Sequence, residues 1–182
     1  MALRFTISYL EDSLTLVRYY KQLAEGAMAQ AADDHLFLAL NEETNSIAVI
    51  VNHMTKNMIS RWTDFLTTDG EKPGRDRDRE FSEPPTTRQD LMDRWNEGWQ
   101  CVFTALEPLT DADLTRTITI RGEPHSVTQA INRQMAHYSY HVGQIVFLAK
   151  QLRASEWKCL SIPRGQSSAF NQKVAKGQAS QR

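Results

Sequence analysis

This sequence contains few cysteines and has almost no net charge. Its 182 residues include only Cys101 and Cys159, which lie far apart and form no CxxC pair. Such sparse, unpaired cysteines are typical of a reducing compartment, in which both thiols stay reduced. Either cysteine could also be a plain buried apolar residue. The formal charge is −1 and the pI is about 6.5, so no strongly basic surface is available to attract nucleic acid.

Long apolar runs are absent as well. No stretch approaches the roughly 18 apolar residues of a membrane-spanning helix. The first residues, MALRFTISYLEDSL, carry acids where a signal peptide has its apolar core. Hydrophobic residues make up 41% and charged residues 24%, which is ordinary for globular proteins and argues against disorder. We therefore expect a cytoplasmic protein with one main domain and with neither membrane nor nucleic-acid partners.

Four segments repeat apolar residues at steps of three and four, which is typical of amphipathic helices. Thr86 or Thr87 can cap the third segment, and Pro108 ends it. Ser126 or Thr128 can start the fourth. These patterns predict helices at about residues 4–31, 43–67, 87–106 and 126–153.

The connections between these helices differ in character. Residues 69–85, DGEKPGRDRDREFSEPP, predict a long loop whose dense charges form a solvated surface. LTRTITIRGEPHSV predicts a short hairpin with Arg121-Gly122-Glu123 as its turn and an edge strand after Pro124. The polar end of the chain predicts a flexible tail, with the last dozen residues disordered. The expected division is a helical domain over residues 1–165 and a tail over 166–182.

Three of the five histidines form the most informative pattern in the chain. His137 and His141 are four residues apart in QMAHYSYHVGQ, so a helix places both imidazoles on one face, where they can reach the same cation. His53 comes from a separate predicted helix. Three neutral imidazoles leave a coordination position free, as in a catalytic zinc-type centre. The alternative is that all three are core groups without a metal. His35 and His125 fall in connecting segments and are expected to be bystanders.

Polar residues accompany the histidines on both helices. His53, Asn57 and Arg61 form an i, i+4, i+8 row, and Gln134 and Gln144 lie on the face of the pair. Such rows suggest a wet cavity inside a four-helix bundle, a fold that builds metal sites from facing helices. The alternative for the first row is the solvent face of an amphipathic helix.

The chain resembles the DinB-like superfamily, within the subgroup DUF1572. The similar stretches are NSIAVIVNHMTKNMISRWTDFL, DRDREF, EGW, IRGEPHSVTQAINRQMAHYSYHVGQIVFLAK and WKCLSIPRGQSSAFN, which together cover almost the whole chain. The resemblance implies an all-α, up-down-down-up four-helix bundle, with a short hairpin before the last helix. It also implies a divalent metal bound by His53, His137 and His141, and a homodimer.

Function is open at this point, because a fold does not fix a chemistry. Relatives in the superfamily include metal-dependent S-transferases that use low-molecular-weight thiols. The alternatives are a metal-dependent hydrolase and a non-catalytic protein that binds a metal or small ligand. Zinc or nickel is the expected metal, although imidazole also accepts copper, iron and cobalt. The residues that could act on a small-molecule substrate are Asn57, Arg61 and Gln144, with Arg121 and Arg164 as further candidates.

Overall fold

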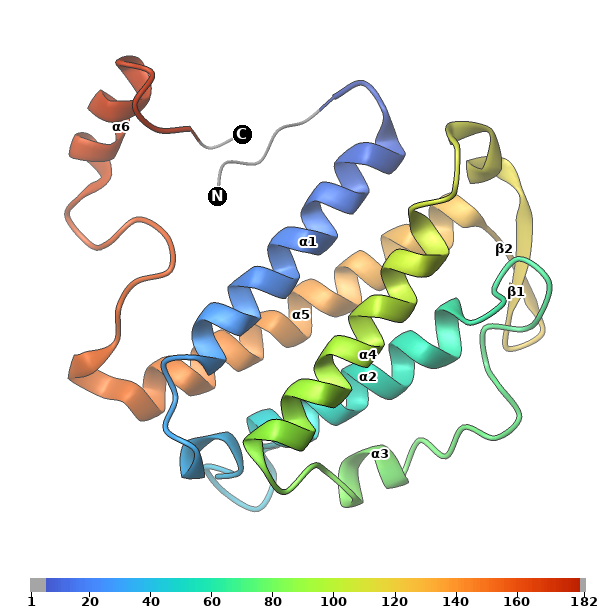
Figure 1. The fold of residues 1–182 in the computed structure, drawn as a ribbon, viewed down its shortest axis with the longest axis horizontal. Helices are drawn as coiled ribbons and strands as arrows, with labels where there is room; N and C mark the ends of the chain where they lie inside the picture. Colours follow the sequence, from blue (N-terminus) through green and yellow to red (C-terminus); the bar gives the residue numbers. More distant parts are fainter. Residues whose placement is uncertain (1–5, 181–182) are drawn as a thin grey trace.

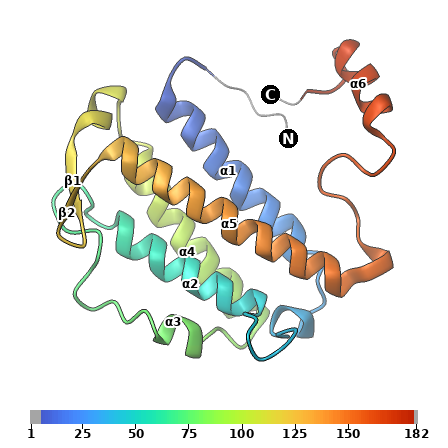
Figure 2. The same ribbon diagram turned by 180° about the vertical axis from the view of Figure 1, so that it is seen from behind.

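Long helices dominate the computed structural model, which describes residues 6–180. In Figure 1, α1 and α5 run in one direction, and α2 and α4 run in the opposite direction. Seen from behind, α2 and α5 lie side by side (Figure 2). In the described residues, no helix is both long enough and apolar enough to cross a membrane. The long helices are α1 (Tyr9–Met28), α2 (Ile47–Trp62), α4 (Arg88–Leu106) and α5 (Val127–Arg153), with short turns η1 (Asp34–Leu36), η2 (Asp111–Thr115) and η3 (Ala154–Glu156) between or after them.

Serine and threonine caps begin these helices. The side chains of Ser46, Thr87 and Ser126 each accept a hydrogen bond from the backbone N–H three residues later, which satisfies an otherwise unpaired donor. The side chain of Gln129 in turn accepts a hydrogen bond from the backbone N–H of Ser126, which completes a capping box. Of the caps considered from the sequence, Thr87 and Ser126 are the ones used.

The central helix of the molecule is α2. It packs against both α4 and α5, and α1 packs against α5. Because α2 is covered on several sides, almost all of its residues are buried, polar ones included. Trp62, Trp95 and Trp99 are at most 3% exposed, and Trp157 packs partly buried against the same core. All four tryptophans therefore contribute to a single core.

A two-stranded antiparallel sheet precedes α5. It consists of β1 (Thr117–Ile120) and β2 (Glu123–Ser126). Arg121 and Gly122 connect the strands with φ angles of 56° and 76°, the left-handed conformation of the tight turns that match strand twist. Glu123 belongs to the second strand, so the turn has two residues where the sequence suggested three.

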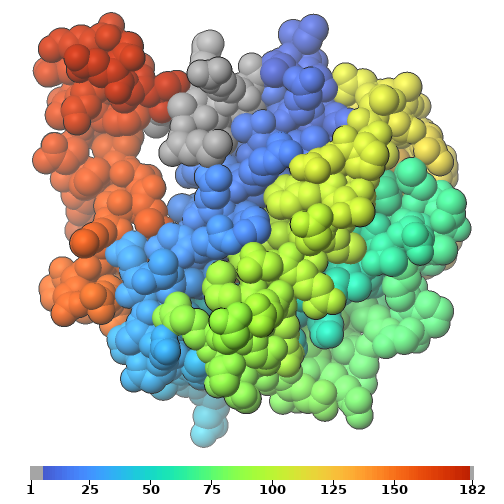
Figure 3. Space-filling model, in the orientation of Figure 1, coloured from blue at the N-terminus to red at the C-terminus, as the bar shows by residue number. Residues whose placement is uncertain are grey.

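Two segments carry short helices that the sequence pattern did not indicate. Within the charged segment, α3 (Arg79–Ser82) packs against α2. Within the predicted tail, α6 (Ser167–Ala175) has no buried residue. Figure 3 shows the chain beyond α5, in orange to red, along one side of the molecule. The predicted start of the first helix at residue 4 lies outside the described residues.

Candidate metal centre

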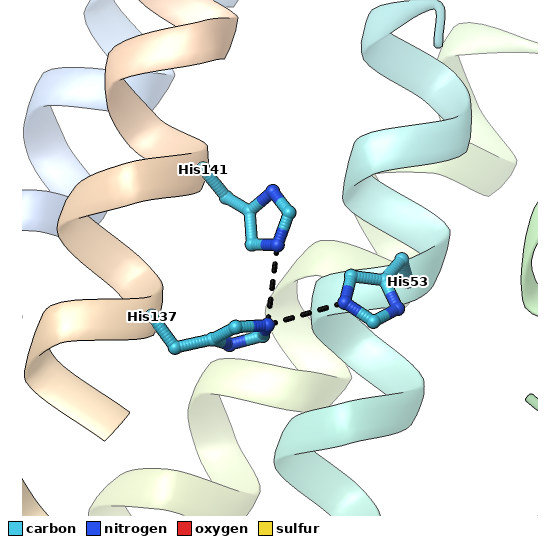
Figure 4. A group of neighbouring side chains, drawn as sticks. All are labelled: His53, His137 and His141. Atoms are coloured by element: carbon cyan, nitrogen blue, oxygen red, sulfur yellow. Dashed lines mark hydrogen bonds between the residues drawn. The ribbon is translucent and has the colours of Figure 1, made fainter. Parts of the chain in front are cut away.

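The structure brings His53, His137 and His141 together between α2 and α5. Figure 4 shows the three rings pointing toward one another from the two facing helices. The Nε2 atoms of His53 and His141 each lie 3.1 Å from the Nε2 atom of His137. One ring nitrogen from each histidine lies within 4.8 Å of the others. His53 is 5% exposed, and the other two are partly buried.

A buried carboxylate forms a hydrogen bond with His53. The Nδ1 atom of His53 lies 2.7 Å from Oε2 of Glu80. Burial by itself would raise the pKa of Glu80, but hydrogen bonds from His53 and Arg75 outweigh it and hold the pKa below its ordinary value. Glu80 is thus an ionised acceptor, so Nδ1 of His53 carries the hydrogen. In the tautomer with hydrogen on Nδ1, the lone pair of the ring is at Nε2, which lies on the side of the other two histidines.

Gln144 has the same effect on His141. Its carboxamide oxygen lies 2.8 Å from Nδ1 of His141, which therefore donates and leaves the lone pair at Nε2. His137 has no comparable partner: its Nδ1 atom is buried and makes no hydrogen bond within the described residues. Two of the three Nε2 lone pairs are therefore directed at the common centre by neighbouring side chains.

The pair on α5 is neutral at physiological pH. Burial, followed by repulsion from His141 and His53, lowers the pKa of His137 to about 3. Burial likewise lowers the pKa of His141 to about 4, although its hydrogen bond to Gln144 opposes the shift. Because a metal binds neutral imidazole, neither ring needs to lose a proton at pH 7 before binding.

These residues fit a divalent cation. Neutral imidazole nitrogens are ligands that zinc, nickel, copper and iron accept. Converging lone pairs repel one another unless a proton or a cation lies between them. The hydrogen bonds to Glu80 and Gln144 are the outer contacts that metal-binding histidines generally make.

Glu80 and Arg75 are the residues of this centre that the sequence interpretation missed. Their side chains are only 2% and 4% exposed and form an ion pair at 2.6 Å. The expectation that residues 69–85 form a solvated charged surface is therefore wrong for these two, because the segment packs against α2. One signal was available: Phe81 is an aromatic residue inside the charge run, and its ring stacks on His53.

The polar row on α2 is buried, so it is not the solvent face of an amphipathic helix. Asn57 and Arg61 are 7% and 5% exposed. The Arg61 guanidinium already contacts Glu71 at 2.9 Å and the carbonyl of Gly70, so it is engaged away from the histidines. The carboxamide oxygen of Asn57 is buried without a hydrogen-bond partner in the described residues. Of the candidates for substrate contact, Gln144 is the one with a hydrogen bond to the triad among the described residues.

The remaining candidates lie elsewhere. Arg121 in the hairpin turn pairs with Glu71 at 3.0 Å. Arg164 is exposed and takes part in none of the ion pairs seen between residues 6 and 180. His35 lies in η1, and His125 in β2 faces the carbonyl of Glu123, so neither joins the triad.

Comparison with known proteins places the chain in a family. A family model described as a protein of unknown function (DUF1572) matches residues 4–166. The chain belongs to the DUF1572 family. In this family member, the matched range contains the three histidines with Glu80 and Gln144, and it ends just before α6. No curated protein and no solved structure matches the chain.

Proposed function

We propose that this DUF1572 protein binds a divalent cation, zinc or nickel, through the Nε2 atoms of His53, His137 and His141. The observation that carries the proposal is the approach of these nitrogens to within 4.8 Å, from two helices, with outer hydrogen bonds that direct lone pairs inward. The alternative, three core histidines without a metal, leaves the converging Nε2 lone pairs without a partner.

The proposal includes membership of the DinB-like superfamily, with a four-helix bundle of up-down-down-up topology. Supporting it are the resemblance described above and the directions of the four long helices, in which α1 and α5 oppose α2 and α4. In such a bundle, metal sites are built from side chains on facing helices, as α2 and α5 are here.

We further propose that the centre activates a low-molecular-weight thiol for transfer to an electrophile. Three protein ligands leave room for an exogenous one, and a bound cation lowers the pKa of a thiol or water at that position. In this transfer, a new S–C bond forms, the leaving group departs with the electrons of the broken bond, and the thiol proton goes to solvent. The chain's own part is to hold the rings: Glu80 orients His53, and Gln144 orients His141.

Two alternatives keep the same centre. A hydrolase would use the open position for water, and a non-catalytic protein would use it for a bound ligand. No carboxylate besides Glu80 contacts the triad in the described residues, and Glu80 is occupied by Arg75 and His53. A carboxylate at the centre would assist the attack of water as a general base, and the absence of an unoccupied one among these contacts favours thiol transfer over hydrolysis.

The test begins with protein stripped of metal by a chelator. Zinc titration is expected to give one site per chain, and His137→Ala is expected to weaken binding by orders of magnitude while leaving the helix content unchanged. His125→Ala is the matched control, because His125 lies outside the triad. Equal zinc occupancy in wild type and in the His53→Ala/His141→Ala variant would contradict the proposed centre.

Activity needs a separate measurement. The zinc and nickel forms are expected to transfer cysteine, as a simple thiol, to a chlorinated aromatic electrophile, with the rate lost on chelation. Cobalt-substituted protein is expected to change its visible spectrum when thiol or azide is added. Metal binding without turnover and without a spectral response would leave the non-catalytic binder as the function.

Association and location complete the proposal. Tyr140 and Phe147, seven residues apart on α5, are 63% and 62% exposed, and such exposed aromatic groups favour a homodimer. Cys101 and Cys159 are both free thiols, which agrees with a reducing, cytoplasmic location.

A further inference from the structure

A series of ion pairs connects the hairpin turn with His53. The Arg121 guanidinium contacts Glu71 at 3.0 Å, and Glu71 contacts Arg75 at 3.2 Å. Arg75 contacts Glu80 at 2.6 Å, and Glu80 contacts His53 at 2.7 Å. Cations and anions alternate along the series, so none of the buried charges lacks a counter-charge.

Arg75 makes the most restrictive contact in this series. Its Nε atom donates to Oε1 of Glu80 at 2.6 Å, and its Nη2 atom donates to Oε2 at 3.0 Å. Two bonds between planar groups fix the plane of the carboxylate as well as its position. A third bond, from Nη1 to Glu71, holds the guanidinium from its other end.

The fixed carboxylate leaves His53 little freedom. Oε2 of Glu80 accepts from both Arg75 and Nδ1 of His53, so a rotation of the carboxylate would break both bonds. The ring of Phe81 stacks on the imidazole, with centroids 4.8 Å apart. The Nε2 atom of His53 consequently faces α5.

We infer that Arg75 is a positioning residue of the histidine centre: acting through Glu80, it holds His53 in the tautomer with hydrogen on Nδ1 and with Nε2 available to a metal. The effect on metal binding rests on the proposed function. The effect on the tautomer does not, because it concerns the metal-free protein. The charged segment thereby belongs to the centre, although it lies far from all three histidines in α2 and α5 along the chain.

The first experiment measures the tautomer. The imidazole nitrogens of the metal-free protein are observed by ¹⁵N NMR, with His53 assigned from its loss in His53→Ala. Wild type is expected to show hydrogen on Nδ1 alone. In Arg75→Met the carboxylate loses its fixed orientation, and the Nε2–H form is expected to appear.

The second experiment measures zinc affinity. Arg75→Met is expected to lower it by about 10- to 100-fold, the usual effect of losing an outer hydrogen-bond partner. Glu80→Gln is expected to do the same, and Arg75→Met/Glu80→Gln to cost little more than either change alone, because both act through one contact. Arg75→Lys is expected to recover part of the affinity, since it keeps the charge without the paired bonds.

Arg79→Met is the matched control. Arg79 belongs to the same charged segment, but its side chain is 69% exposed and its partners, Asp76 and Glu83, lie 3.6 Å away. This variant is expected to keep both the tautomer and the zinc affinity of wild type.

The outcomes separate this inference from the proposed function. If Arg75→Met keeps the zinc affinity and the His53 tautomer of wild type, the role of Arg75 is overturned and the metal centre is left intact. Should Arg75→Met not fold, the same result in Glu80→Gln would have this consequence. Equal losses in Arg79→Met and Arg75→Met would also overturn it, because a general loss of charge would then explain both. If wild type binds no zinc, the proposed function fails. The tautomer of His53 in Arg75→Met then still shows whether Arg75 controls the position of the ring hydrogen.

Discussion

The contact between α2 and α4 can be tested with one substitution made at two helical glycines. At Gly98 on α4, an added Cβ would lie 3.0 Å from Cα of Thr55 and 3.1 Å from Sδ of Met58, both on α2. At Gly143 on α5, it would meet no heavy atom within 4 Å. Replacing each glycine with alanine therefore compares a crowded site with an open one.

The two variants are expected to change stability in opposite directions. Alanine favours a helix over glycine by about 1 kcal/mol, which is the whole effect at Gly143. At Gly98 the same gain is offset by overpacking, which costs about 1–3 kcal/mol and is severe here because the nearest atom belongs to the backbone of α2. We expect Gly98→Ala to be less stable than Gly143→Ala by roughly 2 kcal/mol.

The assay is urea unfolding of the metal-free proteins, monitored by circular dichroism. The free energies of unfolding are compared with that of wild type, with the denaturant dependence of the free energy (the m-value) expected to be the same in all three proteins. Zinc affinity gives a second readout. Since α2 carries His53, displacing it should weaken zinc binding in Gly98→Ala. Gly143→Ala should bind zinc as wild type does, although Gly143 lies between His141 and Gln144. Equal stabilisation by both substitutions would refute the close packing of α2 on α4.

Three further predictions concern pH, a buried hydrogen bond and association. The lowered pKa values of His137 and His141 mean that, between about pH 6.5 and pH 4, these rings are protonated only in the unfolded chain, so stability should fall as the pH falls through that window. Urea midpoints of metal-free protein should show the fall, and a His137→Gln/His141→Gln variant with an equal fall would contradict it. Tyr138→Phe removes the acceptor of the buried Trp62 indole N–H, now bonded at 2.7 Å, and should cost about 1–3 kcal/mol in thermal unfolding; a neutral effect would mean that the indole finds another partner. Light scattering should give the mass of a dimer that Phe147→Ser weakens, whereas a monomer mass over a wide concentration range would rule the dimer out.

The His137/His141 pair of the triad could be predicted because its evidence is local. A separation of four residues places His137 and His141 on one helix face whatever surrounds the helix. The long helices could be predicted for the same reason, since apolar periodicity and caps such as Thr87 and Ser126 are properties of the segment itself. The predicted ends of α4 and α5 agree with the observed ones, whereas α1 ends at Met28 rather than near residue 31 and α2 ends at Trp62 rather than near residue 67.

Tertiary structure alone decided which charged and aromatic side chains are inside. The charge run around Arg75 and Glu80 has the composition of a solvated loop, and only its packing against α2 turns two of its members into a buried ion pair that holds His53. The burial of the tryptophans depends on tertiary structure in the same way. Sequence periodicity predicts which face of a helix they occupy, but not which other elements cover that face. The sequence by itself determined the helices and the one-face pair of His137 and His141, because both depend on neighbours along the chain. The partners of the triad depend on neighbours in space, which a single sequence does not specify.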